Sequence, residues 1–190
     1  MEKVKKDFRK EMRLKRAHFF LETPQELQQE WAASLWEQVQ QHPAFIQAHT
    51  VLLYSALPDE VPTETFIARW ADKKQILLPV VCGDTLILRR YDPNALQNGY
   101  QGVLEPNALC EEWTPQDVDF AVVPGLAFTP DGQRMGRGKG YYDRLIPQLT
   151  HAVKVSVAFP FQLCEQIPQD PWDERVDVVY QAKPLSDTKY

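Results

Sequence analysis

The chain has 190 residues, of which 44% are hydrophobic and 25% charged, with a formal net charge of −5 at pH 7. These values are typical of a soluble globular protein, and no apolar run approaches the roughly 20 residues of a membrane span. The basic N-terminus is not followed by an apolar signal core, so we expect a cytoplasmic protein. The length predicts a single domain over residues 1–190, and we expect a monomer.

The charge is distributed unevenly along the chain. Residues 1–16 contain eight Lys or Arg and three acids, a net charge of +5, so the remaining residues carry −10. A basic helix can bind nucleic acid or an anionic membrane, but an acidic body would repel a long polyanion while a single nucleotide could still bind locally. We therefore expect small-molecule ligands, with neither nucleic acid nor a membrane as a partner.

The cysteines and histidines give no sign of a zinc site. Cys82, Cys110 and Cys164 are odd in number and far apart, and the four histidines are scattered. Neither set has the spacing of metal ligands. We expect reduced, buried thiols.

Two helices are predicted before residue 42. The first covers residues 2 to about 20. The second runs to about residue 41, with Thr23 as its N-cap and Pro24 at its first helical position, and it ends before Pro43. Its inner face is expected to carry Leu27, Trp31, Leu35 and Val39.

Strands then alternate with helices. The continuous apolar run at 50–54 is typical of a strand buried on both faces. Further strands are predicted at 75–79, 85–90, 118–123, 153–157 and 176–180, and helices at 63–71 and from about Lys139 to before Pro147. Gly83-Asp84 is a hairpin-type turn. This alternation predicts a three-layer α/β fold with a largely parallel sheet.

Residues 91–117 show no clear period and contain three prolines. We expect a long irregular segment that covers a pocket.

The most informative segment is 124–144, which follows the predicted strand 118–123. It contains five of the eight glycines, and four cations alternate with them. Without a Cβ, backbone amides can approach a ligand and form an anion-binding nest; with fixed cations and a helix N-terminus they suit a polyphosphate. The alternative is a surface turn with solvated charges, which does not explain the alternation. The cations are Arg134, Arg137, Lys139 and Arg144.

Two common phosphate motifs are excluded by counting. A P-loop requires Gly, four residues, Gly-Lys and then Ser or Thr, but Gln133 lies five before Gly138, and Lys139 is followed by Gly140. A dinucleotide fingerprint requires Gly-x-Gly-x-x-Gly directly after a strand, whereas these glycines are spaced by two and lie well beyond residue 123. The loop therefore binds phosphate in another way.

The segment Gly136–Arg144, behind Val123–Phe128, resembles the signature of the 5-formyltetrahydrofolate cyclo-ligase family (methenyltetrahydrofolate synthetases). Three weaker blocks extend the resemblance in the family's order over nearly the whole chain: Lys5–Arg9, Ser55–Thr63 and Asp173–Asp177. The resemblance implies a Rossmann-like variant of the α/β fold. Its departures are modest: Thr129 stands where an aspartate is common, Met135 replaces leucine, and Trp172 replaces histidine.

The implied reaction converts 5-formyltetrahydrofolate and ATP to 5,10-methenyltetrahydrofolate, ADP and phosphate, with Mg²⁺ as cofactor. Transfer of the γ-phosphoryl group to the formyl oxygen makes that oxygen a good leaving group and the formyl carbon a good electrophile. The second folate nitrogen then closes the ring. The protein's task is positioning and charge neutralisation.

The resemblance also implies roles for individual residues in nucleotide binding. Lys5 and Arg9 are four apart on one helix face, which could otherwise be a solvated basic face. Arg137, Lys139 and Tyr141 are the implied catalytic residues, with Arg137 and Tyr141 contacting both ligands. The two tyrosines of the loop could otherwise be core aromatics. The implied ATP-binding residues are Lys5, Arg9, Arg134, Gly136, Arg137, Gly138, Lys139, Gly140, Tyr141 and Tyr142.

The implied metal ligands are Asp143 and Asp173, since Mg²⁺ needs only one or two carboxylates besides phosphate and water. Asp177 is the alternative to Asp173, and Asp143 could instead pair with Arg144 or Arg137.

The implied folate contacts are Ser55 and Glu60, together with Arg137 and Tyr141. The Glu60 carboxylate could accept two hydrogen bonds from the pterin, or it could be a surface acid in a turn. A non-catalytic nucleotide-binding module, or an ATP-dependent enzyme acting on another substrate, remain alternatives on the residues alone.

Overall fold

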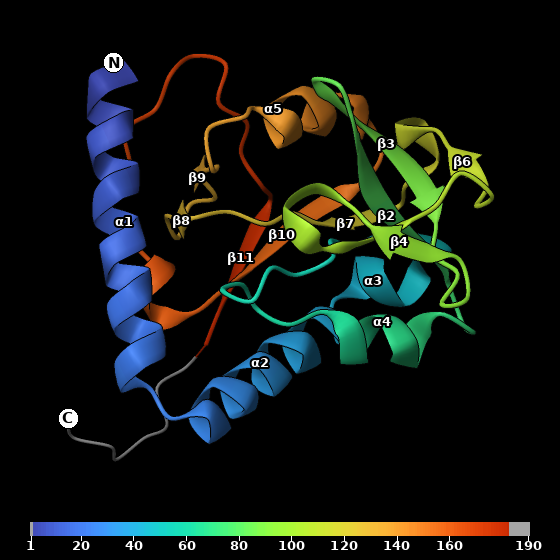
Figure 1. The fold of residues 1–190 in the computed structure, drawn as a ribbon, viewed down its shortest axis with the longest axis horizontal. Helices are drawn as coiled ribbons and strands as arrows, with labels where there is room; N and C mark the ends of the chain where they lie inside the picture. The colour runs from blue at the N-terminus through green and yellow to red at the C-terminus, as the bar shows by residue number, and fades with distance from the viewer. Residues whose placement is uncertain (1, 183–190) are drawn as a thin grey trace.

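The structure, a computed structural model, describes residues 2–182. Over these residues the main sheet has the strand order β11-β10-β7-β1-β2-β3-β6 and lies between helices (Figure 1). The strands from β11 to β2 are parallel, and β3 and β6 are antiparallel to their neighbours. The predicted α/β fold with a largely parallel sheet is confirmed.

Except for β6, the strands of the main sheet lie where the apolar runs placed them. Gly83 has a φ of 59° in the tight turn between β2 and β3, as the Gly-Asp pair predicted. The strands are β1 (Thr50–Leu52), β2 (Gln75–Cys82), β3 (Thr85–Arg90), β6 (Glu112–Trp113), β7 (Phe120–Val122), β10 (Val153–Ala158) and β11 (Val178–Gln181).

The helices are α1 (Glu2–Glu22), α2 (Gln25–Gln40), α3 (Pro43–Gln47), α4 (Glu64–Trp70) and α5 (Tyr141–Leu145). The Thr23 cap prediction was wrong, because Pro24 is the N-cap and the Thr23 carbonyl accepts a bond from the Gln28 side chain. The helix α2 ends before Pro43, as predicted. Pro43 is the first residue of α3, because its fixed φ suits a first helical position.

The last helix is shorter than predicted. It begins at Tyr141 because Gly140, at φ 68°, is left-handed and cannot belong to the helix. A 3₁₀ turn, Ile146–Gln148, follows it and contains Pro147 near its start, where a missing N–H costs no hydrogen bond.

The core lies on both faces of the sheet. Val51 and Leu53 pack with α2, α3 and α4, whereas Leu52 packs with α5 on the opposite face. Successive side chains of a strand point to opposite faces, so a continuous apolar run fits a strand covered on both sides. Figure 1 shows α2, α3 and α4 below the sheet and α5 above it.

Residues 91–117 are more regular than predicted. They contain β6 and a separate hairpin of β4 (Leu96–Asn98) and β5 (Leu104–Pro106), whose tip is the 3₁₀ turn Tyr100–Gly102. Strands of two or three residues are too short to show a period in the sequence.

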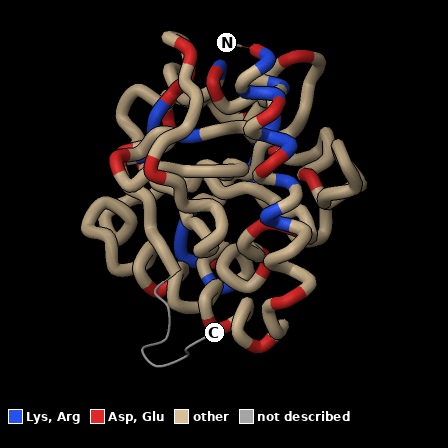
Figure 2. The backbone as a smooth tube through the Cα atoms, turned by 90° about the vertical axis from the view of Figure 1, so that its left-hand side faces the viewer, with Lys and Arg blue, Asp and Glu red and all other residues tan. Residues whose placement is uncertain are grey.

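The helix α1 packs against the second small hairpin, β8 (Ala127–Phe128) and β9 (Arg134–Met135), on the left of Figure 1. Met12 of α1 is fully buried there. Figure 2, which faces α1, shows Lys and Arg recurring along the helix. This packing brings the basic N-terminus to the edge of the glycine-rich segment.

The cysteines are free, as predicted, but the prediction that they are buried was wrong. Cys82 is exposed beside the β2–β3 turn, and Cys110 and Cys164 are half-buried. Among residues 2–182 no group of three or more His, Cys, Asp or Glu is arranged to hold a metal ion. In the same range no helix has the length and apolar character that crossing a membrane requires.

The same substitution, leucine to alanine, should change the free energy of unfolding very differently in the core and at the surface. Leu53 is 0% exposed and Leu109 is 91% exposed. We expect Leu53→Ala to lower the free energy of unfolding by about 2–5 kcal/mol, because it leaves a cavity. Leu109→Ala should change it by less than about 0.5 kcal/mol. Urea unfolding followed by circular dichroism measures both, and equal losses would contradict the assigned burial.

Candidate functional site

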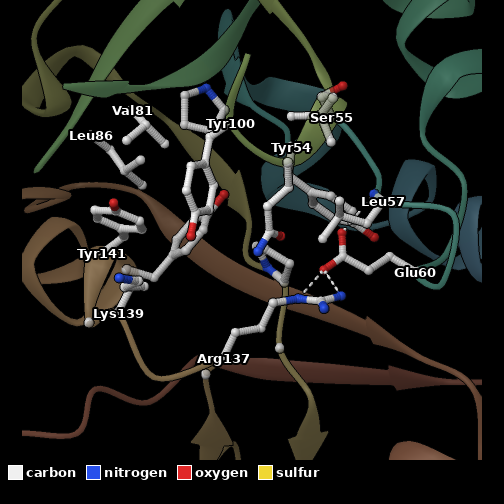
Figure 3. Close-up of a pocket in the computed structure, with 18 of the residues that line it drawn as sticks. Tyr54, Ser55, Leu57, Glu60, Val81, Leu86, Tyr100, Arg137, Lys139 and Tyr141 are labelled. Atoms are coloured by element: carbon white, nitrogen blue, oxygen red, sulfur yellow. Dashed lines mark hydrogen bonds and ion pairs between the residues drawn. The ribbon is translucent and has the colours of Figure 1, made fainter. Parts of the chain in front are cut away.

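A cavity of about 440 Å³ opens where the parallel strands β1 and β7 end (Figure 3). Tyr54 and Ser55 follow β1, and Pro124 and Gly125 follow β7. The carboxyl edge of the strands is where open α/β sheets bind ligands. The β4–β5 tip forms another wall, as predicted for a pocket-covering segment.

Most residues singled out in the sequence line this one cavity. They are Ser55, Glu60, Arg134, Gly136, Arg137, Lys139, Gly140, Tyr141, Tyr142 and Asp143. The structure thus brings the loop after β1 and the glycine-rich segment together, although they are far apart in the chain. Four predicted residues are not in the lining: Lys5, Arg9, Gly138 and Asp173.

The glycine-rich segment reaches the cavity through left-handed backbone. Gly138 has a φ of 108° and Gly140 one of 68°. Arg9 of α1 touches this loop from outside the cavity, since its Nε donates to the Gly136 carbonyl at 3.0 Å. The Lys139 side chain is exposed, and no described residue forms a hydrogen bond or ion pair with its ammonium.

Arg137 lies against two carboxylates of the loop after β1, and Figure 3 shows its pairing with one of them, Glu60. Its Nη2 is 2.8 Å from Glu60 Oε1 and 2.8 Å from Asp59 Oδ1, and its Nε donates to Glu60 Oε1 at 3.1 Å. Burial would lower the pKa of Arg137, but the charges of Glu60 and Asp59 outweigh burial and raise it. The other oxygen of Glu60 accepts a bond from the Leu57 N–H.

Arg134 is 3% exposed and holds Asp143. Its Nη2 pairs with Asp143 Oδ1, its Nη1 donates to the Pro124 carbonyl at 3.3 Å, and its guanidinium lies 5.8 Å from the ring centre of Tyr142. Asp143 therefore has an ion-pair partner, but that partner is neither Arg144 nor Arg137, the two considered from the sequence.

Lys5 joins the two ends of the described chain. It is 5% exposed, its Nζ lies 2.7 Å from Asp170 Oδ2, and it also pairs with Asp173. Asp177 lies elsewhere: its carboxylate accepts a bond from the Lys154 N–H at 2.7 Å beside β10. Of the two aspartates left open in the tail, Asp173 is thus the one beside α1.

Several lining residues were missed in the sequence. Arg13 lies four positions after Arg9, and helical spacing alone could have found it. Tyr100 and Glu105 come from the β4–β5 hairpin, which gave no periodic signal. The Tyr100 ring meets the Tyr141 ring edge-on at 6.2 Å, so the hairpin tip faces the start of α5 across the cavity.

Glu105 holds the hairpin tip in place. It is 5% exposed, and its Oε1 accepts a hydrogen bond from the Tyr100 N–H at 3.2 Å. A Cβ at Gly99 would lie 2.1 Å from the Glu105 carboxyl carbon, so only glycine leaves room for this acid inside the turn. Burial raises the pKa of Glu105 more than its backbone hydrogen bonds lower it.

This raised pKa has a measurable effect on stability. Between the pKa of the unfolded chain and the raised pKa, the folded protein binds the extra proton, so the free energy of unfolding falls as pH rises. Glu105→Gln removes this titration. The stability of the wild type relative to Glu105→Gln should therefore be greatest in acid and decline as pH rises through the raised pKa.

Urea unfolding of both proteins at several pH values measures the difference. Glu111→Gln, at an exposed acid six residues later, is the control and should give a curve parallel to the wild type. A Glu105→Gln curve that is also parallel would contradict the assigned burial of the carboxylate.

Comparison with known proteins places this site in context. A model of the 5-formyltetrahydrofolate cyclo-ligase family matches residues 1–182. The 5-formyltetrahydrofolate cyclo-ligase of Escherichia coli strain K12 is 30% identical, over 80% of this chain and 87% of the relative, and that of Mus musculus is 29% identical, over 80% and 83%.

Two solved structures share the fold. The 5,10-methenyltetrahydrofolate synthetase of Aquifex aeolicus is 34% identical, with a TM-score of 0.84 over 98% of this chain and 95% of that one. A 5,10-methenyltetrahydrofolate synthetase from Mycoplasma pneumoniae superposes with a TM-score of 0.72 over 92% and 96%, at 23% identity.

Proposed function

Because this chain belongs to the 5-formyltetrahydrofolate cyclo-ligase family, we propose that it converts 5-formyltetrahydrofolate to 5,10-methenyltetrahydrofolate with ATP as co-substrate and release of ADP and phosphate. One observation carries the proposal. The glycine-rich loop with Arg137 and Lys139, and the acid Glu60, line a single cavity, so a polyphosphate and a folate could meet there.

The proposed chemistry begins with the formyl group, whose carbon is a poor electrophile. The γ-phosphoryl group of ATP passes to the formyl oxygen, the second folate nitrogen attacks the formyl carbon, and phosphate leaves with that oxygen. Such transfers depend on in-line positioning and on neutralising charge at the phosphoryl oxygens. The Lys139 ammonium supports this role, because it is exposed on a loop whose glycines allow close approach.

Arg137 is placed to connect the two ligands. Its guanidinium pairs with Glu60, while its backbone belongs to the loop proposed to bind phosphate. Tyr141 lines the same cavity and begins α5. These contacts support roles for Arg137, Lys139 and Tyr141 in holding the reacting groups.

Glu60 is proposed to bind the pterin. Its Oε1 already accepts from both Nε and Nη2 of Arg137, and its Oε2 accepts from the Leu57 N–H. A carboxylate offers about four lone-pair sites, so one site, on Oε2, is left for a pterin N–H group. Ser55, on the same loop, is the second proposed folate contact.

Asp143 and Asp173 would hold a Mg²⁺ ion. The donor set fits, because Mg²⁺ commonly takes one or two carboxylates and completes its shell with phosphate oxygens and water. When bound, the ion would neutralise charge on the transferring phosphate. Both aspartates have cationic partners here, Arg134 and Lys5, which would be shared with an ATP–Mg²⁺ complex. A cytoplasmic, monomeric protein stays an expectation from the sequence.

The function is tested by mixing protein, ATP, Mg²⁺ and 5-formyltetrahydrofolate and following the absorbance of the methenyl product. We expect absorbance to rise only in the complete mixture and to stop when EDTA removes the metal. Calorimetry of ATP binding accompanies it. ATP binding without product would favour a non-catalytic nucleotide-binding module or another substrate, and would overturn the proposal.

Lys139→Ala should raise the ATP concentration required for half-maximal rate. A charge-assisted hydrogen bond to phosphate contributes about 1.5–3 kcal/mol, hence about ten- to hundredfold in affinity. Stability should not change, because the side chain is exposed. Lys73→Ala, at another exposed lysine before β2, is the control and should leave the ATP requirement unchanged. Equal affinities in both variants would count against this loop as the phosphate site.

A further inference from the structure

Arg137 belongs to a chain of charges that extends beyond the proposed binding residues. Asp59 precedes Glu60 on the loop after β1 and binds Arg137 Nη2 through Oδ1 at 2.8 Å. Its other oxygen, Oδ2, lies 2.5 Å from Nη1 of Arg16, on α1. Three segments distant in the sequence therefore meet at one aspartate.

Arg137 needs such support, because the backbone around it is permissive. It lies between Gly136 and Gly138, and Gly138 has a φ of 108°. An arginine side chain loses much rotamer entropy when it is fixed. Glu60 alone engages one edge of the guanidinium, through Nε and Nη2, whereas Asp59 binds Nη2 from the neighbouring position. Two carboxylates fix the plane of the group as well as its place.

Asp59 is itself restrained. Its side chain is 28% exposed and that of Arg16 is 21% exposed, so water screens this ion pair only in part. The pair is close but lacks a well-aligned hydrogen bond, so it acts mainly through charge. Without Arg16, the carboxylate of Asp59 would have no second cation to fix it, and only Arg137 would remain as its partner.

The helix α1 thus contacts the Arg137 segment at two points. Arg9 bonds the Gly136 carbonyl directly before Arg137 at 3.0 Å, and Arg16, two turns further along, reaches the side chain of Arg137 through Asp59. The anchor of α1 on the body is the fully buried Met12, between these two arginines. One rigid helix therefore supports both the backbone and the side chain of this segment.

We propose that Asp59 and Arg16 are positioning residues, which fix the Arg137 guanidinium against Glu60 so that it faces both ligands in one orientation. The inference rests on the proposed function, since it is Arg137 that is taken to contact ATP and folate. Neither Asp59 nor Arg16 lines the cavity, so neither is placed to touch the reacting atoms. Their removal should impair turnover more than ligand binding.

The kinetic test compares Asp59→Asn, Arg16→Gln and the double variant. Misplacing a catalytic group by a fraction of an ångström costs on the order of tenfold in rate. We expect each single variant to lower kcat about tenfold, with ATP affinity by calorimetry within about twofold of wild type. The double variant should be no slower than the slower single one, because both changes remove the same link. Arg16→Lys keeps the charge and should recover part of the rate.

Lys15→Gln is the matched control. Lys15 precedes Arg16 on the same helix and pairs at 2.7 Å with Glu11, and both side chains are about half exposed. It should leave kcat unchanged. Unchanged kcat in Asp59→Asn, or multiplied losses in the double variant, would overturn the proposal. So would a rate loss matched by a fall in the unfolding temperature, which indicates a structural role.

A second measurement needs no activity. The Nε–H signal of Arg137 in a ¹⁵N NMR spectrum, assigned by its loss in Arg137→Lys, reports how firmly the guanidinium is held. It should broaden or shift in Asp59→Asn and Arg16→Gln but not in Lys15→Gln. A wild-type protein that makes no product would refute the proposed function alone, whereas an Arg137 signal unchanged in both variants would refute this inference alone.

Discussion

The parallel pairing of β1 with β7 is the constraint on which the rest of this molecule depends. In this pairing Val51 lies beside Phe120 and Leu52 beside Ala121. Because the strands run in the same direction, both end at the same edge of the sheet. The loop with Asp59 and Glu60 and the glycine-rich segment therefore leave the sheet side by side. The pairing is maintained by apolar side chains packed on both faces, and the hydrophobic effect supplies the main driving force. The site is thus a consequence of core packing.

Charge compensation is the second theme of the site. The half-buried or buried cations Lys5, Arg134 and Arg137 each pair with one or two carboxylates. A cation removed from water without a partner would be costly, whereas a paired one can later share its charge with an anionic ligand. Lys139 differs, since it stays hydrated and is paired with no described residue. This distribution would suit the proposed role of the cavity, which is to be stable when empty and to bind a polyphosphate.

The two small hairpins complete the cavity without belonging to the main sheet. The β8–β9 hairpin carries the glycine-rich segment and receives α1, and the β4–β5 hairpin brings Tyr100 opposite Tyr141. A buried polar side chain supports each hairpin, Arg134 in the first and Glu105 in the second. Buried polar groups of this kind act through a few directional hydrogen bonds, which fix the backbone beside the cavity.

The sequence by itself determined most strands of the main sheet, its largely parallel pairing and the glycine-rich loop with its cations, because those depend on local patterns: continuous apolar runs, turn residues and the alternation of glycine with cations. It also marked ten of the residues that line the cavity. Only the tertiary structure decided their partners. Glu60 and Arg137 are 77 positions apart, and Lys5 and Asp173 are 168 apart, so no local spacing specifies which carboxylate meets which cation. The packing of α1 and of the β4–β5 hairpin likewise decided that Arg13, Tyr100 and Glu105 line the cavity. Such long-range packing is not encoded locally in short, aperiodic segments.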